Sequence, residues 1–185
     1  MSARTPDRGA VTVRRATSSD LTSVARVHVE TWKATYRGIV SDDWLDALKV
    51  ESDIARGFGQ WLARPIPGWA QFAAIDSLEG VVGFAAGGPE SDHDPEFTGE
   101  LGAIYVLKSF QGRGFGRKLT AEIARHLLGT GHHSMLVWIL EANPYRRFYE
   151  KLGGVPVRTK MARVAGALLP EVAYGWIDIR GLTGE

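Results

Sequence analysis

Residues able to bind a charged ligand gather between an apolar run and an amphipathic segment. The run Leu101–Leu107 predicts a buried strand, and the glycine-rich sequence Gln111-Gly112-Arg113-Gly114-Phe115-Gly116 follows it. Arg117 and Lys118 then begin a predicted helix. The N–H groups at a helix start are unpaired and carry partial positive charge, and glycines let the main chain approach a ligand closely. This arrangement is typical of a site for a phosphate group.

Two common phosphate-binding motifs do not fit this turn. A Walker A loop ends in G-K-[ST], but Arg117 follows Gly116 here. A dinucleotide fingerprint requires G-x-G-x-x-G, and its sixth position, counted from Gly112 or Gly114, is Arg117 or Leu119. The ligand of the turn is therefore not identified by either motif.

The pattern Q-x-x-G-x-G at Gln111–Gly116 resembles the cofactor turn of the GCN5-related N-acetyltransferase (GNAT) superfamily. A second similar segment lies downstream, where Asn143 precedes the sequence FYEKLG at Phe148–Gly153. One predicted helix and one apolar strand separate the two segments, as in that family. The resemblance extends over nearly the whole chain by element order and is specific over about Glu100–Gly154. The step from Asn143 to Tyr149 is six positions, whereas many members of the family have seven.

The resemblance implies an enzyme that transfers the acetyl group of acetyl-coenzyme A to a primary amine by direct attack in a ternary complex. In that family the glycine turn holds the pyrophosphate of the cofactor, and the preceding strand pairs with its pantetheine arm. The implied cofactor-binding residues are Ile104, Tyr105, Val106, Gln111, Gly112, Arg113, Gly114, Phe115, Gly116, Arg117 and Asn143. No metal is expected. The alternative is a domain of the same fold that binds or senses coenzyme A without catalysis.

Acetyl transfer from a thioester to an amine needs two proton movements, because the amine loses a proton and the departing thiolate gains one. Tyr149 is the expected general acid; a buried tyrosine packed beside Tyr145 is the alternative. Glu100 is the expected general base, because a glutamate often has this role in the family and strand alternation places it on the face of Gly102 and Ile104. A solvated carboxylate at a strand end is the alternative for Glu100.

The acceptor is less well defined by the sequence. The segment Glu90–Glu100 contains Glu90, Asp92, Asp94, Glu96 and Glu100 against one histidine, and this acidic loop is a candidate attractor for a cationic amine. A run of charge is more often a solvated surface, so both interpretations stay open. By the resemblance, Trp32–Ile39 borders the acceptor site. The acceptor is expected to be a small molecule or a peptide with a free amine.

Hydrophobic periodicity and turn signals predict the order β-α-α-β-β-β-α-β-α-β-β. The expected fold is a single mixed α/β (α+β) domain, with a mostly antiparallel twisted sheet flanked by about four helices. Strands are predicted near residues 11–15, 69–75, 81–86, 101–107, 135–140, 155–164 and 172–179, and helices near residues 17–36, 41–61, 117–128 and 143–152. Gly87-Gly88-Pro89 is expected to end the third strand, and residues 166–170 to form the last loop. Residues 1–10 are predicted to be a flexible tail, and 11–185 the N-acetyltransferase domain.

Composition restricts the remaining possibilities. A formal charge of +1 over 185 residues gives no broad basic field, so nucleic acid is not an expected partner. Without cysteine the chain can form no disulfide, thiolate metal site or thiol nucleophile. No apolar run approaches the length of a membrane span, so no membrane partner is expected. We therefore expect a cytoplasmic protein, and the family resemblance leaves a homodimer open.

Overall fold

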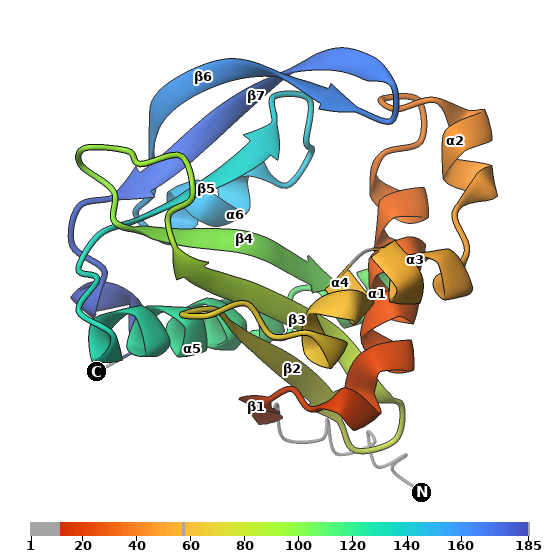
Figure 1. The fold of residues 1–185 in the computed structure, drawn as a ribbon, viewed down its shortest axis with the longest axis horizontal. Coiled ribbons are helices and arrows are strands. Elements are labelled where there is room, and N and C mark those ends of the chain that lie inside the picture. Colours follow the sequence, from red (N-terminus) through yellow and green to blue (C-terminus); the bar gives the residue numbers. More distant parts are fainter. Residues whose placement is uncertain (1–11, 57, 185) are drawn as a thin grey trace, which may run out of the picture.

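A computed structural model describes residues 12–56 and 58–184, apart from the side chains of residues 55–60. Seven strands form one twisted sheet in the order β1-β2-β3-β4-β5-β7-β6 (Figure 1). All neighbouring strands are antiparallel except β4 and β5, which are parallel. The predicted mixed, mostly antiparallel sheet is therefore confirmed. The expected tail at residues 1–10, and Val11 of the first expected strand, lie outside the described residues.

The strands and helices alternate along the chain much as the sequence predicts. The strands are β1 Thr12–Arg15, β2 Ala70–Asp76, β3 Gly80–Pro89, β4 Gly99–Val106, β5 Met135–Leu140, β6 Val155–Val164 and β7 Ala167–Trp176. The helices are α1 Leu21–Thr35, α2 Asp42–Ala47, α3 Val50–Arg56, α4 Phe58–Ala63, α5 Phe115–Gly129 and α6 Arg146–Lys151. Among the described residues, no helix has both the length and the apolar character needed to cross a membrane.

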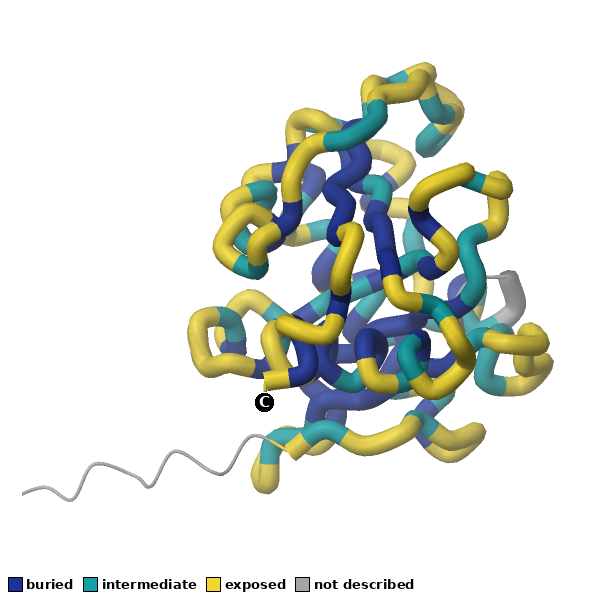
Figure 2. Tube along the Cα trace, turned by 90° about the vertical axis from the view of Figure 1, so that its left-hand side faces the viewer, coloured by how far each residue is buried: buried dark blue, intermediate teal, exposed yellow. Residues whose placement is uncertain are grey.

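Helices cover both faces of the sheet, because successive residues of each strand point to opposite sides. On one face, Leu119, Ile123 and Leu127 of α5 pack into the larger hydrophobic core. On the other face, Val24 and Val27 of α1 pack in a second core built on β2, β3 and β4. Figure 2 shows the buried residues gathered in the interior of the molecule and the exposed residues along its periphery. The sheet therefore lies between two apolar layers.

The two central strands diverge after a short region of contact. Within the described chain, β4 and β5 pair only at Gly99 with Met135 and at Glu100 with Leu136. The backbone N–H of Gly99 donates to the carbonyl of Ser134 at 3.0 Å, which closes this end. A Cβ on Gly99 would lie 2.9 Å from that carbonyl oxygen, so this close approach requires glycine. Beyond Glu100 the strands separate, and one edge of β4 is left without a partner strand.

The predicted second helix is wrong, because residues 41–61 form three short helices. The backbone of Leu48 is extended (φ −63°, ψ 128°) and ends α2. The chain then turns, and both α3 and α4 contact α1. The apolar residues that are spaced at helical intervals therefore lie on three short helices and not on one face of a single long helix.

The predicted end of the third strand is also wrong. β3 continues through Gly87-Gly88-Pro89, which pair with Leu101, Glu100 and Gly99 of β4. A Cβ on Gly87 would lie 2.6 Å from Ile123, and one on Gly88 would lie 2.5 Å from Trp69. These glycines allow close packing above and below the sheet and do not break the strand.

Two boundaries near the C-terminus differ as well. β7 begins at Ala167 and not near residue 172, because Ala165 and Gly166 have positive φ values (51° and 83°) and form a two-residue hairpin turn. Helix α6 begins at Arg146, three residues after Asn143. The segment between Asn143 and Arg146 is a turn, and this turn becomes important in the site.

Candidate active site

A cavity of about 600 Å³ occupies the region where β4 and β5 separate. Its walls come from these strands, the glycine turn, α6 and the end of α1. Most of the residues predicted for the site line this cavity: Ile104, Tyr105, Val106, Gln111, Gly112, Gly114, Gly116, Arg117, Asn143 and Tyr149. The fold therefore brings the two separate sequence segments together around one space.

The glycine turn has the conformation that its sequence predicts. Gly112 and Gly114 have φ values of 74° and 87°, a region that side chains rarely adopt. A Cβ on either residue would meet nothing within 4 Å, so both face open space. The side-chain amide of Gln111 donates to the carbonyl of Val106 at 3.0 Å and joins the turn to the end of β4. The unpaired N–H groups at the start of α5 are consequently available at the cavity wall.

Two of the predicted cofactor residues have side chains outside the cavity lining. Phe115 is 2% exposed and packs in the larger core, with its ring edge-to-face on Phe110. The Arg113 guanidinium lies 4.7 Å from the centre of the Phe110 ring. The Phe115 side chain therefore anchors the start of α5, and its backbone is the part that lies at the glycine turn.

Two cations that the sequence did not identify line the cavity beside Arg117. Arg147 and Lys151 lie on α6 at positions i and i+4, which places them on one side of the helix. A ring carbon of Phe148 would lie 3.0 Å from a Cβ on Gly116, so α6 packs directly on the first turn of α5. The signal in the sequence was the spacing of these cations around the FY pair.

Tyr149 is held in the cavity wall by aromatic stacking. It is 6% exposed, and its ring stacks on Tyr174 with centres 5.8 Å apart. The Tyr174 hydroxyl donates to Glu150 Oε1 at 2.9 Å and accepts from Arg146 Nε at 3.1 Å, which fixes the supporting ring. Burial, and secondarily the neighbouring Tyr36, raise the pKa of Tyr149. Its phenol therefore stays protonated at neutral pH.

Asn143 connects two other parts of the cavity. Its Oδ1 accepts the backbone N–H of Tyr145 at 2.8 Å and stabilises the turn before α6. Its Nδ2 donates to the hydroxyl of Tyr36 at 3.0 Å. Tyr36 follows directly after α1, is 7% exposed and lines the cavity. Burial raises the pKa of Tyr36 to about 12, against a lowering by the Asn143 hydrogen bond.

Glu100 lies apart from this cavity lining, at the end of β4 that pairs with β5. Ser91 Oγ donates to Glu100 Oε2 at 3.1 Å. Burial raises the pKa of Glu100, and the charges of Glu90 and Asp92 raise it further. Glu100 pairs with Leu136, and Trp138, two residues further along the same face of β5, does line the cavity. Glu100 and Trp138 therefore lie on the same face of the sheet, and Trp138 borders the cavity.

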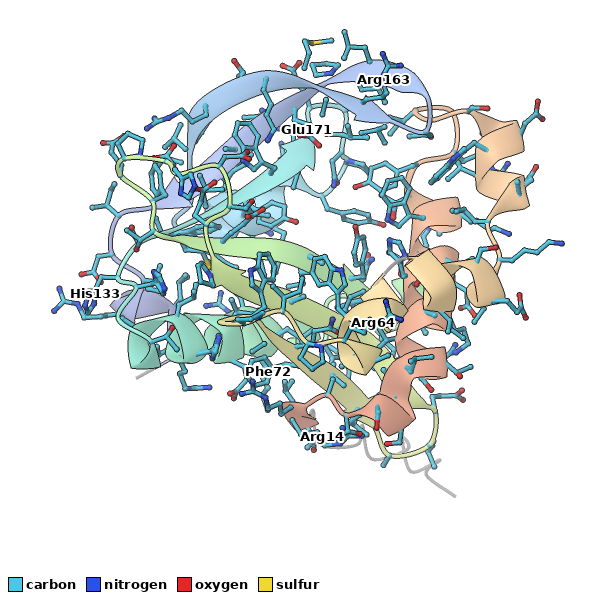
Figure 3. The ribbon with its side chains drawn as sticks, in the orientation of Figure 1. Arg14, Arg64, Phe72, His133, Arg163 and Glu171 are labelled. Carbon is cyan, nitrogen blue, oxygen red and sulfur yellow. The ribbon has the colours of Figure 1, made fainter. Side chains whose placement is uncertain are left out.

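Several carboxylates of the acidic loop make contacts within the protein. Both oxygens of the Glu90 carboxylate accept backbone N–H groups of the loop, from Asp92 and Asp94. Arg158 of β6 pairs with Asp94 at 3.2 Å and with Glu96 at 2.5 Å. A third ion pair joins Lys160, also of β6, to Asp92 at 3.2 Å. Another carboxylate, Glu171 of β7, lies on the hairpin above the end of β5 (Figure 3).

Comparisons with known proteins agree on one kind of relative. The family model described as FR47-like protein matches residues 93–164. An uncharacterized N-acetyltransferase of Bacillus subtilis, YuaI, is 38% identical over 172 residues, which cover 93% of this chain and 96% of that protein.

Solved structures give the same result for the fold. The PaiA N-acetyltransferase of Thermoplasma acidophilum, in complex with coenzyme A, has a TM-score of 0.66 and 16% identity, covering 88% of this chain and 98% of its own. A GNAT superfamily phosphinothricin acetyltransferase of Sinorhizobium meliloti, in complex with acetyl-coenzyme A, has a TM-score of 0.66 and 21% identity, covering 90% of this chain and 87% of its own.

Proposed function

The chain belongs to the GCN5-related N-acetyltransferase superfamily and is an acyltransferase, and from this premise we propose that it transfers the acetyl group of acetyl-coenzyme A to a primary amine. We propose direct attack of the amine in a ternary complex. The observation that carries the proposal is the cavity in which the glycine turn, the α6 cations and Tyr149 meet. The acceptor is proposed to be a small molecule or a peptide.

The residues present fit acetyl-coenzyme A. Gly112 and Gly114 leave open space beside the unpaired amides at the start of α5, which suits a pyrophosphate. Three cations of the cavity lining can pair with the negatively charged phosphate oxygens of the cofactor: Arg117, Arg147 and Lys151. The edge of β4 beyond Glu100 offers backbone groups that can pair with the amides of a pantetheine arm, as an added strand would. When bound, the cofactor supplies the acetyl group as a reactive thioester.

The proton balance requires one donor and one acceptor. We assign Tyr149 as the group that donates its phenolic proton to the departing sulfur, since burial keeps that proton in place at neutral pH. The proton released by the amine restores the Tyr149 phenol through solvent, so the net transfer runs from amine to thiol. Glu100 is the proposed acceptor of the amine proton, and it would act through water because its side chain lies outside the cavity lining.

Calorimetry with acetyl-coenzyme A, ATP and NAD, each alone, tests the cofactor. We expect acetyl-coenzyme A to bind and the two nucleotides to bind weakly or not at all. Gly114→Ala should weaken acetyl-coenzyme A binding about tenfold, because a side chain strains the turn that presents the amides. Gly131→Ala is the matched control: its φ of 88° and its open surroundings are similar, but it lies at the far end of α5. Binding of ATP alone would contradict the proposal.

A thiol-release assay with a panel of amines tests the reaction itself. The panel should include polyamines, amino acids, aminoglycosides and peptides with free N-termini or lysines. We expect release of free coenzyme A that depends on one class of amine. Binding of acetyl-coenzyme A without thiol release for any amine would favour the alternative, a domain that binds or senses the cofactor.

A further inference from the structure

Among the tyrosines that line the cavity, Tyr36 reaches it from the opposite side of the sheet to Tyr149. Tyr149 belongs to the core on the α5 face. Tyr36 follows α1, which packs on the other face, and its ring is buried with Val40, Leu45 and Leu140. Both residues line the cavity, and Tyr36 is close enough to contribute to the raised pKa of Tyr149. The two phenols therefore approach the gap between β4 and β5 from its two sides.

The direction of the Tyr36 hydrogen bond follows from the bonds of Asn143. A backbone N–H can only donate, so the atom of Asn143 that faces the Tyr145 N–H at 2.8 Å must be the amide oxygen. The NH₂ group of Asn143 then faces Tyr36, and the phenol oxygen of Tyr36 accepts its hydrogen bond at 3.0 Å. The proton of Tyr36 must therefore point elsewhere. Within the described residues, Asn143 is the one hydrogen-bond partner found for this hydroxyl, which leaves its proton for a ligand in the cavity.

We propose that Tyr36 is a further catalytic residue, whose hydroxyl donates a hydrogen bond to the carbonyl oxygen of the acetyl group. Asn143 is a positioning residue that fixes the direction of the Tyr36 hydroxyl. This inference rests on the proposed acetyl transfer. It also gives Asn143 a role within the protein, since its amide oxygen and its amide nitrogen each make a hydrogen bond to another residue of the chain.

The hydrogen bond would act where charge develops during the reaction. As the amine nitrogen forms its bond to the carbonyl carbon, the carbonyl electron pair moves onto the oxygen that Tyr36 faces. That pair returns when the carbon–sulfur bond breaks, and the sulfur takes its proton from Tyr149. The amine proton leaves by the route already described, and Tyr36 keeps its own proton throughout. Donation from Asn143 onto the phenol oxygen polarises the Tyr36 O–H and makes it a stronger donor.

Infrared difference spectroscopy of the complex with acetyl-coenzyme A, ¹³C-labelled at the thioester carbonyl, tests this contact without turnover. A hydrogen bond to the carbonyl lowers its stretching frequency. We expect the bound band of the parent protein to lie below that of free acetyl-coenzyme A, and most of this shift to be lost in Tyr36→Phe. Phe keeps the buried ring, so packing with Leu140 is preserved. The kcat of Tyr36→Phe should fall about a hundredfold or more, with little change in the KM for acetyl-coenzyme A.

Asn143→Asp is a second variant that keeps the phenol and the shape of the site. A carboxylate cannot donate, so it would accept the Tyr36 proton and turn it away from the cavity. The infrared shift should be reduced to the level of Tyr36→Phe, and the double variant should be no worse than either single variant. Tyr174→Phe is the control, because it also removes a buried phenol hydroxyl, in this case one that makes two hydrogen bonds. Tyr174 is not part of the cavity lining, so the infrared shift should persist in this variant.

The outcomes separate this inference from the proposed function. An unchanged carbonyl frequency in Tyr36→Phe, with acetyl-coenzyme A still bound, would overturn the role of Tyr36 and leave acetyl transfer intact. Absence of acetyl-coenzyme A binding by the parent protein would overturn both. A shift lost in Tyr36→Phe but fully kept in Asn143→Asp would overturn the positioning role of Asn143.

Discussion

The two ends of β4 carry residues of different chemistry and have different neighbours. At the Gly99 end, β4 pairs with β5, and the acidic loop is tied to β6 through Arg158 and Lys160. At the Val106 end, the strands have separated, and the cavity is lined by the glycine turn and by tyrosines, among them Tyr36 after α1 and Tyr149 of α6. We call these the closed end and the open end.

This difference explains why charge alone is a poor guide to the active site here. Carboxylates at the closed end accept backbone N–H groups and pair with Arg158 and Lys160, so several of them have structural partners within the fold. The open end presents phenols whose protons are kept by burial. We therefore expect substitutions at the open end to change rates and cofactor binding. At the closed end we expect substitutions to change stability, except at Glu100, the proposed acceptor of the amine proton.

The largest effect should come from Tyr149→Phe at the open end. Loss of a general acid is expected to lower kcat by about 10²–10⁴-fold, while the ring stacking on Tyr174 and the KM for acetyl-coenzyme A stay nearly unchanged. Steady-state kinetics with a responsive amine measure both constants. Normal turnover in this variant would show that Tyr149 is not the general acid. It would also contradict the expectation that substitutions at the open end change the rate.

The next effect should come from the double variant Arg147→Gln with Lys151→Gln. If these α6 cations hold phosphate charge, the KM for acetyl-coenzyme A should rise about 10- to 100-fold, with kcat nearly constant, because the two cations are expected to contribute about 1.5–3 kcal/mol together through hydrogen bonds to the phosphates. The increase should be larger at low salt. Arg163→Gln is the control, since this exposed arginine of β6 lies outside the cavity lining. An equal effect in the control would indicate a general loss of positive charge.

The sequence predicted those parts of the fold that depend on local patterns. The apolar run of β5, the helical repeat of α5 and the glycine turn each carry their own signal within a few residues. The division of residues 41–61 into three helices depends on packing against α1, and the continuation of β3 through Gly87 and Gly88 depends on the approach of Ile123 and Trp69. No local pattern contains those contacts.

The same reason limits what the sequence could say about the site. Glycines and the FY pair were visible as motifs, and the structure brings them to one cavity. The contact between Asn143 and Tyr36 joins residues 107 positions apart, so it has no signature in either segment. The pairing of the acidic loop with Arg158 and Lys160 is also long-range, and it gives part of this charge run a structural role that no local pattern shows.

Arg158→Gln sharpens the comparison from the closed end. Removing the partner of Asp94 and Glu96 should lower the free energy of unfolding only slightly, because both ion pairs are partly exposed. The KM for the amine should stay the same if the acidic loop is structural. If instead the acidic loop attracts the amine, freeing its carboxylates should lower that KM. Urea denaturation and acceptor kinetics on the same preparation distinguish the two results.

The smallest effect on stability is expected from Glu100→Gln, and the activity of this variant tests the boundary between the two ends. Burial raises the pKa of Glu100 above its unfolded value of about 4.3, so the folded protein holds this proton more tightly than the unfolded chain. Ionised Glu100 therefore lowers stability at pH values above its folded pKa and has no such cost below about pH 4. Glu100→Gln should therefore raise the free energy of unfolding slightly at pH 7.5. This gain should disappear as the pH falls toward 4, as measured by denaturation across that range.

The activity of Glu100→Gln shows whether Glu100 takes part in catalysis or affects only the stability of the closed end. If Glu100 accepts the amine proton, Glu100→Gln should be more stable and slower, and the rate should recover in part at high pH, where more of the amine is already neutral. If Glu100 only fills the closed end, stability should rise and the rate should not change. Glu171→Gln is the matched control, because burial also raises the pKa of Glu171, which is on the same face but two strands away. A rate loss confined to Glu100→Gln would indicate that the catalytic residues include Glu100 at the closed end, on the same face of the sheet as Trp138.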